Sequence, residues 1–101
     1  SHMVGATPYL IQHEKNGLVF ESGNVESLVY EVTKVLNNTS YQMQLGKNAY
    51  ETIDITWNAK EAAKRFVHFC NTKDLTVYTD GPCAKAKPVR EYKMYKKLTE
   101  N

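Results

Sequence analysis

Three consecutive stretches of this chain repeat apolar residues at steps of three and four, and this periodicity constrains the fold more than any other feature. Such spacing places the apolar side chains along one face of an α-helix. The three predicted stripes are Val25, Leu28, Val29, Val32, Val35 and Leu36; then Tyr41, Leu45, Ala49 and Ile53; then Ala59, Ala62, Ala63, Phe66, Val67 and Cys70. Valine is a mediocre helix former, so the first stripe must be held by packing.

Polar residues mark where these helices should begin. The expected N-caps are Asn24, Ser40 and Thr56, whose side-chain oxygens can accept hydrogen bonds from first-turn amides. Glu26 suits the positive end of the first helix, and Asn37-Asn38 should end it.

Three features inside the second and third helices carry further predictions. Gly46 costs roughly 1 kcal/mol relative to alanine, which indicates that a neighbouring backbone passes close to it. Trp57 is expected to fill the junction between the two helices. Glu61 and Arg65 are spaced as a favourable i,i+4 ion pair outside the apolar stripe.

The N-terminal stretch predicts short elements. Residues 4–8 contain two breakers and should form a turn, after which residues 9–11 can form one helical turn. Asn16-Gly17 predicts a tight turn because both residues tolerate positive φ. The apolar residues 18–20 are then a strand candidate, closed by Gly23.

Beyond Cys70 the pattern changes to alternation. Leu75, Val77 and Thr79 alternate with Thr76 and Tyr78, which predicts a short strand, and Asp80-Gly81-Pro82 then breaks the chain. A last helix is predicted from Pro88, with an apolar stripe of Val89, Tyr92, Tyr95 and Leu98 against a basic face.

Composition is that of an ordinary globular domain, with 101 residues, 42% hydrophobic and 24% charged. These values exclude a disordered, collagen-like or disulfide-rich chain. Ser1-His2-Met3 is interpreted as an expression-tag remnant, so the natural sequence should begin at Val4 within a larger parent. Two distant cysteines and the lack of a signal-like or membrane-spanning block predict reduced thiols in a cytoplasmic protein.

Positive charge gathers at the C-terminus. The formal net charge is +2, but seven basic residues oppose four acidic ones from Lys73 onward. This excess is too small to predict a nucleic-acid partner. Packing of the basic tail back onto the protein is the expected arrangement, and attachment to an anionic membrane surface is the alternative.

Five short motifs in order resemble the C-terminal end of family-four (group 1) glycosyltransferases of GT-B fold. They are Val4-Gly5-Ala6-Thr7-Pro8, Asn16-Gly17-Leu18-Val19-Phe20, Gly23-Asn24, Leu45-Gly46-Lys47-Asn48-Ala49 and Thr56-Trp57. The resemblance spans residues 4–71. Ala6, Tyr9, Ser22 and Asn24 depart from the family pattern, which has Gly, Glu, Pro and Asp there.

This resemblance implies a parent with two Rossmann-like domains that moves a sugar from a nucleotide-sugar donor with retention of configuration. The family's paired glutamates and donor-phosphate ligands would lie upstream of Val4, so no catalytic residue is assigned in this chain. The chain itself is expected to bind no cofactor.

Gly5, Ala6 and Thr7 are the candidate donor-side residues, because open α/β sheets bind ligands just beyond their strands' carboxyl ends. A plain turn is the alternative there. His13, Glu14 and Lys15 are interpreted as a solvated loop. The spacing of His68, Cys70 and Cys83 matches no zinc pattern, so no metal site is predicted.

The predicted fold class is α/β for the parent and mostly α for this chain, with three to four helices and one or two short strands. Residues 1–3 are assigned to the tag, 4–71 to the C-terminal part of the donor-binding domain, and 72–101 to a basic C-terminal extension with a strand and a helix. Expected partners are the rest of the parent and, through uncovered helix faces, a second copy. The alternative is a small helical interaction module without catalytic activity.

Overall fold

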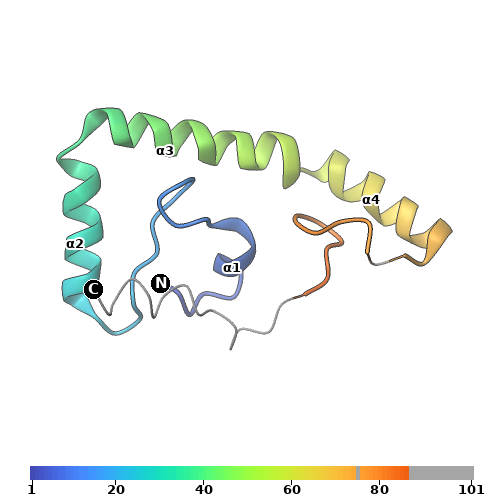
Figure 1. The fold of residues 1–101 in the computed structure, drawn as a ribbon, viewed down its shortest axis with the longest axis horizontal. Coiled ribbons are helices and arrows are strands. Elements are labelled where there is room, and N and C mark those ends of the chain that lie inside the picture. The colour runs from blue at the N-terminus through green and yellow to red at the C-terminus, as the bar shows by residue number, and fades with distance from the viewer. Residues whose placement is uncertain (75, 87–101) are drawn as a thin grey trace.

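The computed structural model describes residues 1–74 and 76–86. Its elements are α1 (Thr7–Leu10), α2 (Val25–Leu36), α3 (Thr39–Glu51), the π-helical turn η1 (Thr52–Thr56) and α4 (Ala59–Thr72). Helices α2 and α3 meet at an angle, and α3 continues through η1 toward α4 (Figure 1). The loop after α1 lies inside the concave side of this frame. The prediction of a mostly helical chain is confirmed.

Asparagine side chains begin all three long helices. Asn24 Oδ1 accepts from the Ser27 amide at 2.9 Å, as predicted, and α2 ends just before Asn37. The predicted caps Ser40 and Thr56 are wrong by two residues each. Asn38 and Asn58 cap α3 and α4 instead, accepting from amides three residues later at 3.0 and 2.8 Å. Asparagine caps as well as serine or threonine does, so a polar residue two positions away can take the position, before Ser40 in α3 and after Thr56 in α4.

The junction between α3 and α4 is a single π-helical turn. The amide of Trp57 donates to the carbonyl of Thr52 at 3.0 Å, an i→i+5 bond that widens the turn. Asn58 Nδ2 donates back to the Asp54 carbonyl at 2.7 Å. Trp57 is half-buried between η1 and α4, where the sequence placed it. Thr56 belongs to η1, which explains why it does not cap α4.

The loop between α1 and α2 turns as predicted but by a different mechanism. An isolated parallel bridge joins His13 to Gly17, and the Glu14 amide donates to the Gly17 carbonyl at 2.9 Å. Glu14, with φ of 65°, takes the left-handed conformation that was expected of Asn16 and Gly17. Its backbone therefore stores local strain that glycine would not.

The predicted strand at residues 18–20 is wrong, and the described part of the chain contains only the isolated bridge. A strand needs a neighbouring strand to pair with its backbone groups. Here the Val19 amide donates to His13 Nδ1 at 2.9 Å, and the Phe20 carbonyl accepts from the His2 amide at 3.0 Å. Side-chain and turn contacts replace a ladder.

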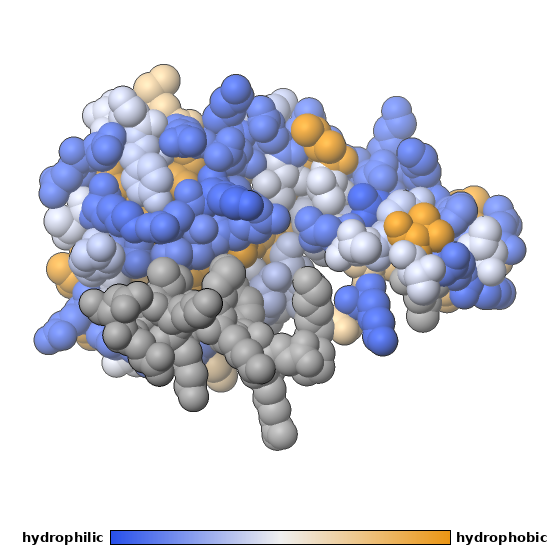
Figure 2. Space-filling model, viewed as in Figure 1, coloured by the Kyte–Doolittle hydropathy of each residue, from blue (hydrophilic) through white to orange (hydrophobic). Residues whose placement is uncertain are grey.

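The core is small. Among the described residues, the buried apolar ones are Val19, which is 2% exposed, and Leu45. The exposed apolar residues include Val25, Leu28, Val29, Val32, Leu36, Ile53, Phe66 and Val67. In Figure 2 apolar side chains form separate patches among hydrophilic ones. A Cβ on Gly46 would meet no atom within 4 Å, so the predicted close backbone is wrong.

Residues 76–86, here the C-terminal loop, fold back against η1 and α4. The predicted strand at residues 75–79 is wrong for the described part, because residues 76, 77, 79 and 80 are bends; residue 75 lies outside the description. Asp80-Gly81-Pro82 does break the chain, with Gly81 at φ of 82°. The helix predicted from Pro88 also lies outside the described residues.

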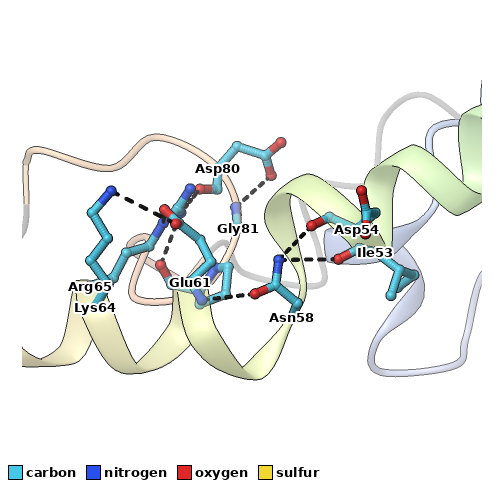
Figure 3. Close-up of polar contacts among 9 residues, drawn as sticks. Ile53, Asp54, Asn58, Glu61, Lys64, Arg65, Asp80 and Gly81 are labelled. Carbon is cyan, nitrogen blue, oxygen red and sulfur yellow. Dashed lines mark hydrogen bonds and ion pairs between the residues drawn. The ribbon is translucent and has the colours of Figure 1, made fainter.

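Arg65 joins the C-terminal loop to α4. Its Nε donates to Glu61 Oε1 at 2.9 Å, which confirms the predicted i,i+4 pair. Its Nη1 donates to the carbonyls of Asp80 and Pro82, the latter at 3.1 Å. The guanidinium also lies 4.4 Å from the centre of the Tyr78 ring. Figure 3 shows Glu61, Arg65 and Asp80 converging on this point.

Candidate functional site

Gly5 and Ala6 stand exposed at the start of α1. Ala6 is the N-cap of this helix and makes no side-chain capping bond. A Cβ built on Gly5 would have no neighbour within 4 Å. The backbone here is therefore open to solvent.

Thr7 differs from its two neighbours because it is buried. Its Oγ1 donates to the Ser1 carbonyl at 3.2 Å, and its amide donates to the Val4 carbonyl at 3.0 Å. Both polar groups serve the local turn. The surface that this segment offers to a ligand is consequently that of Gly5 and Ala6.

A second polar site lies between the α1–α2 loop and α2, and it centres on His13. The His13 side chain is only 5% exposed, so its interpretation as part of a solvated loop is wrong. Because Nδ1 accepts from the Val19 amide, Nε2 carries the proton. That nitrogen lies 3.7 Å from Glu31 Oε1. Glu14 and Lys15, by contrast, are exposed as predicted.

Lys34 connects the loop to α2 through charge. Its ammonium bonds to Glu14 and lies 3.9 Å from Glu31 Oε2. The hydrogen bond from Lys34 is the main reason that the pKa of Glu14 falls below its ordinary value. Burial works to lower the pKa of Lys34, but the bond to Glu14 and the charge of Glu31 outweigh it and raise that pKa. Both groups are thus held in their charged forms.

Tyr41 of α3 completes this polar cluster. Burial raises the pKa of its phenol, and its ring centre lies 6.0 Å from the Lys34 ammonium. The Tyr41 hydroxyl and Glu31 Oε2 are buried without a hydrogen-bond partner. The cluster therefore joins loop, α2 and α3 mainly by electrostatic attraction.

A pocket of about 410 Å³ opens beside this cluster. The pocket is lined by His13, Glu14, Val19, Glu21, Asn24, Glu26, Ser27, Tyr30, Glu31 and Lys34. Four carboxylates thus face it against one ammonium, so its potential is negative. Such a pocket repels the diphosphate of a nucleotide sugar. The candidate donor-side residues Gly5, Ala6 and Thr7 do not line it.

The side chain of Asn16 joins the α1–α2 loop to the start of η1, just after α3. Its Oδ1 accepts from the Gln12 amide at 2.7 Å, and its Nδ2 donates to the Leu10 carbonyl at 2.9 Å and to Thr52 Oγ1 at 2.8 Å. Asn48 adds a bond to the Lys15 carbonyl at 2.7 Å. Sequence reasoning assigned Asn16 only to a turn, since its partner in η1 is 36 residues away.

The residues considered as metal ligands have other neighbours. The His68 ring packs edge-on against Tyr78 with centroids 5.9 Å apart, and Cys70 is exposed. Within residues 1–74 and 76–86 no group of three or more His, Cys, Asp or Glu residues is arranged to hold a metal ion. His68 thus contributes to the contact between α4 and the C-terminal loop.

A comparison with known protein families shows to which family this chain belongs. Residues 1–52 match the model of the glycosyl transferases group 1. The chain belongs to this family. Comparisons with curated proteins and with solved structures gave no match.

The part that matches the group 1 glycosyltransferases runs from the N-terminus through α3 to the first residue of η1. It contains Gly5, Ala6, Thr7 and the whole polar cluster around His13. Helix α4 and the C-terminal loop lie outside it. None of the helices in the described part of this glycosyltransferase chain has the length and apolarity to cross a bilayer.

Proposed function

We propose that this chain is the helical closing part of the donor-binding domain of a retaining glycosyltransferase. The parent transfers a sugar from a nucleotide-sugar donor to an acceptor, and this part plays a structural role without turnover of its own. The match of residues 1–52 to the group 1 glycosyltransferases is the observation that carries the proposal.

The uncovered helix faces support a structural role. Val25, Val29 and Leu36 of α2 and Phe66 and Val67 of α4 are exposed apolar residues. In α/β domains, helices bury such faces against a sheet. The described residues contain no strand to supply one, so the partner surface is expected in the rest of the parent.

Turnover by this chain alone is the direct test of the structural role. The purified chain, incubated with a panel of nucleotide sugars and acceptors, should release no nucleotide above background. The matched positive control is the whole enzyme under the same conditions. Clear turnover by the chain would overturn the structural role while leaving family membership intact.

The gene of the whole enzyme tests the reaction class. It should encode a pair of glutamates seven residues apart and the ligands of the donor phosphates. Absence of that pair would contradict the retaining mechanism but not the family assignment.

The donor-side role of Gly5 and Ala6 is tested in the whole enzyme. Both residues are exposed and small, which lets a ligand approach the backbone. We expect Ala6→Val to raise the KM for the donor several-fold with little change in stability. Gly46→Ala is the matched control, because Gly46 is exposed in α3 with no neighbouring atoms within 4 Å. Equal KM values for the two variants would contradict a donor-side position.

The same structural role predicts that the isolated chain associates with itself, since exposed apolar faces lack their partner surface. Light scattering should therefore give a mass above the 11.6 kDa of one chain. A stable monomer would instead favour a small helical interaction module.

A further inference from the structure

The α1–α2 loop contains the single Asn-Gly pair of the chain, Asn16-Gly17. The amide nitrogen of a residue that follows asparagine can attack the side-chain Cγ, and glycine hinders this attack least because it has no Cβ. The new N–Cγ bond closes a five-membered succinimide ring, the Cγ–Nδ2 bond breaks, and Nδ2 leaves as ammonia with the proton of the glycine amide. Water then opens the ring to aspartate or isoaspartate. The reaction needs no enzyme and no cofactor.

We propose that Asn16 is a deamidation site that the fold protects while the α1–α2 loop is closed, and that deamidation permanently releases this loop from η1. A chain whose loop has opened and reacted cannot restore the original contacts. The site lies within residues 1–52, which match the family, but the inference does not depend on the reaction assigned to the parent.

Three hydrogen bonds fix the side chain of Asn16. Oδ1 accepts from the Gln12 amide at 2.7 Å. The two hydrogens of Nδ2 go to the Leu10 carbonyl at 2.9 Å and to Thr52 Oγ1 at 2.8 Å. Attack on Cγ makes this carbon tetrahedral, and the loss of ammonia requires both Nδ2 bonds to open. The closed loop should therefore react only after a local opening.

The attacking residue, Gly17, is also held in place. Its carbonyl accepts from the Glu14 amide at 2.9 Å, next to the bridge between His13 and Gly17. A Cβ built on Gly17 would lie 3.1 Å from Ile11 Cγ2, so the Ile11 side chain covers this residue. Hydrogen bonding and packing thus restrict the backbone rotation that brings the glycine nitrogen to Cγ of Asn16.

The product of deamidation does not fit the place that Asn16 occupies. The Thr52 hydroxyl donates its hydrogen to the Asn48 carbonyl at 2.8 Å, so it faces Asn16 as an acceptor. The Leu10 carbonyl is an acceptor as well. Deamidation replaces the donating Nδ2 by a carboxylate oxygen, which can only accept. Oxygen then faces oxygen at both contacts, and the link between the loop and η1 is lost.

The rate of deamidation tests the protection. The full chain and a synthetic peptide of residues 10–22 are incubated separately at neutral pH, and exchange of the side-chain NH2 for OH is followed by mass spectrometry. In the chain it is read from residues 15–21, released by cleavage after Glu14 and Glu21. We expect the chain to react at least about tenfold more slowly than the peptide, because opening must come first. Equal rates would overturn the proposal.

Thr52→Val tests the hydrogen bonds themselves. It removes the acceptor of one Nδ2 hydrogen while keeping a similar shape, so deamidation of the folded chain should become several-fold faster. Thr33→Val is the matched control, because Thr33 is exposed in α2, and its rate should equal that of the unaltered chain. A Thr52→Val rate no higher than this control would contradict the protection. A difference that persists in unfolding concentrations of urea would do so as well, because the fold is then absent.

Hydrogen exchange of the Gln12 and Glu14 amides tests the release of the loop. Both amides donate within the loop and should exchange faster in Asn16→Asp than in the unaltered chain. The same comparison is made on aged chain that ion exchange separates from its unreacted form, so the measurement does not depend on folding of the variant. Unchanged exchange at both amides in the aged chain would show that deamidation leaves the loop closed and would overturn its release.

Discussion

The two halves of this molecule hold together by different means. In residues 1–52, which match the family, Val19 and Leu45 are buried while much of the α2 stripe is exposed. In α4 and the C-terminal loop, the contacts centre on Arg65, and Gly81 is buried beside it. The apolar stripe of α2 in the first half is largely uncovered. Phe66 and Val67 of α4 are exposed as well, so the second half differs in the polar contacts that join its loop to the helix.

The largest expected effect is at Gly81. A Cβ there would lie 2.5 Å from Thr56 Cγ2 and 2.6 Å from Arg65 Nη1, at a φ of 82°. We expect Gly81→Ala to lower the free energy of unfolding by about 3 kcal/mol, from steric overlap and backbone strain together. Urea denaturation followed by the fluorescence of the single tryptophan, Trp57, measures it.

Gly46→Ala is the matched control in the first half. Its added Cβ meets no atom within 4 Å, so removal of a helical glycine should raise the free energy of unfolding by about 1 kcal/mol. A gain in the free energy of unfolding for Gly46→Ala and a loss for Gly81→Ala would support the difference between the halves. Equal losses would contradict it.

Arg65 comes next. Arg65→Gln removes the ion pair with Glu61, the two bonds to the C-terminal loop and the contact with Tyr78. We expect a loss of about 2 kcal/mol in the free energy of unfolding and faster proteolysis near Lys85. Lys64→Gln is the control, because Lys64 is largely exposed and its ammonium lies 4.0 Å from Glu61 Oε2, too far for a hydrogen bond. Its loss in the free energy of unfolding should stay below about 0.5 kcal/mol. Similar losses for both would show that Arg65 does not hold the loop.

A smaller effect is expected in the first half at Asn16. Asn16→Ala removes the bonds to the Gln12 amide, the Leu10 carbonyl and Thr52 Oγ1. We expect a loss of about 1.5 kcal/mol in the free energy of unfolding, measured by urea denaturation. Gln12→Ala keeps the backbone amide and changes only an exposed side chain, so its loss should stay below about 0.5 kcal/mol. An unchanged free energy of unfolding in Asn16→Ala would mean that these bonds do not hold the loop.

The smallest effect is the dependence on pH. The hydrogen bond from Arg65 lowers the pKa of Glu61, as that from Lys34 lowers the pKa of Glu14, both from an ordinary value of 4.5. Their stabilisation is therefore complete above pH 4.5 and is lost as the pH falls through the lowered values of the folded state. Glu61→Gln and Glu14→Gln should each flatten the acid side of the stability curve, measured by urea denaturation from pH 6 to 3. An unchanged slope would show that the corresponding pair contributes nothing.

Local chemistry explains which elements were predictable. Helix α2 was predicted from Asn24 to Asn37 because its cap and its stop lie within the helix's own sequence. The caps of α3 and α4 were misplaced by two residues, because adjacent Asn, Ser and Thr residues all suit that position. The i,i+4 pair of Glu61 and Arg65 was predictable for the same reason, since one helix turn brings the two together.

Long-range partners explain the misses. Residues 18–20 read as a strand, but a strand forms only where another backbone can pair with it. The close neighbour expected at Gly46 is absent within 4 Å. The Gly5 to Thr7 segment was found from the family resemblance, yet the burial of Thr7 followed only from its contacts with Ser1 and Val4. The pocket beside His13 was missed because its residues come from two elements.

Periodicity, capping and short motifs act within a few residues of one another, so the helices, most of their polar and apolar faces, and the family could be predicted from the sequence. The burial of His13 against Glu31 and the bonds from Arg65 to Asp80 and Pro82 became known only from the three-dimensional fold. Those contacts join residues 15 to 18 positions apart. Their formation depends on how the chain reverses direction, and a reversal is set by the packing of whole elements rather than by any one residue.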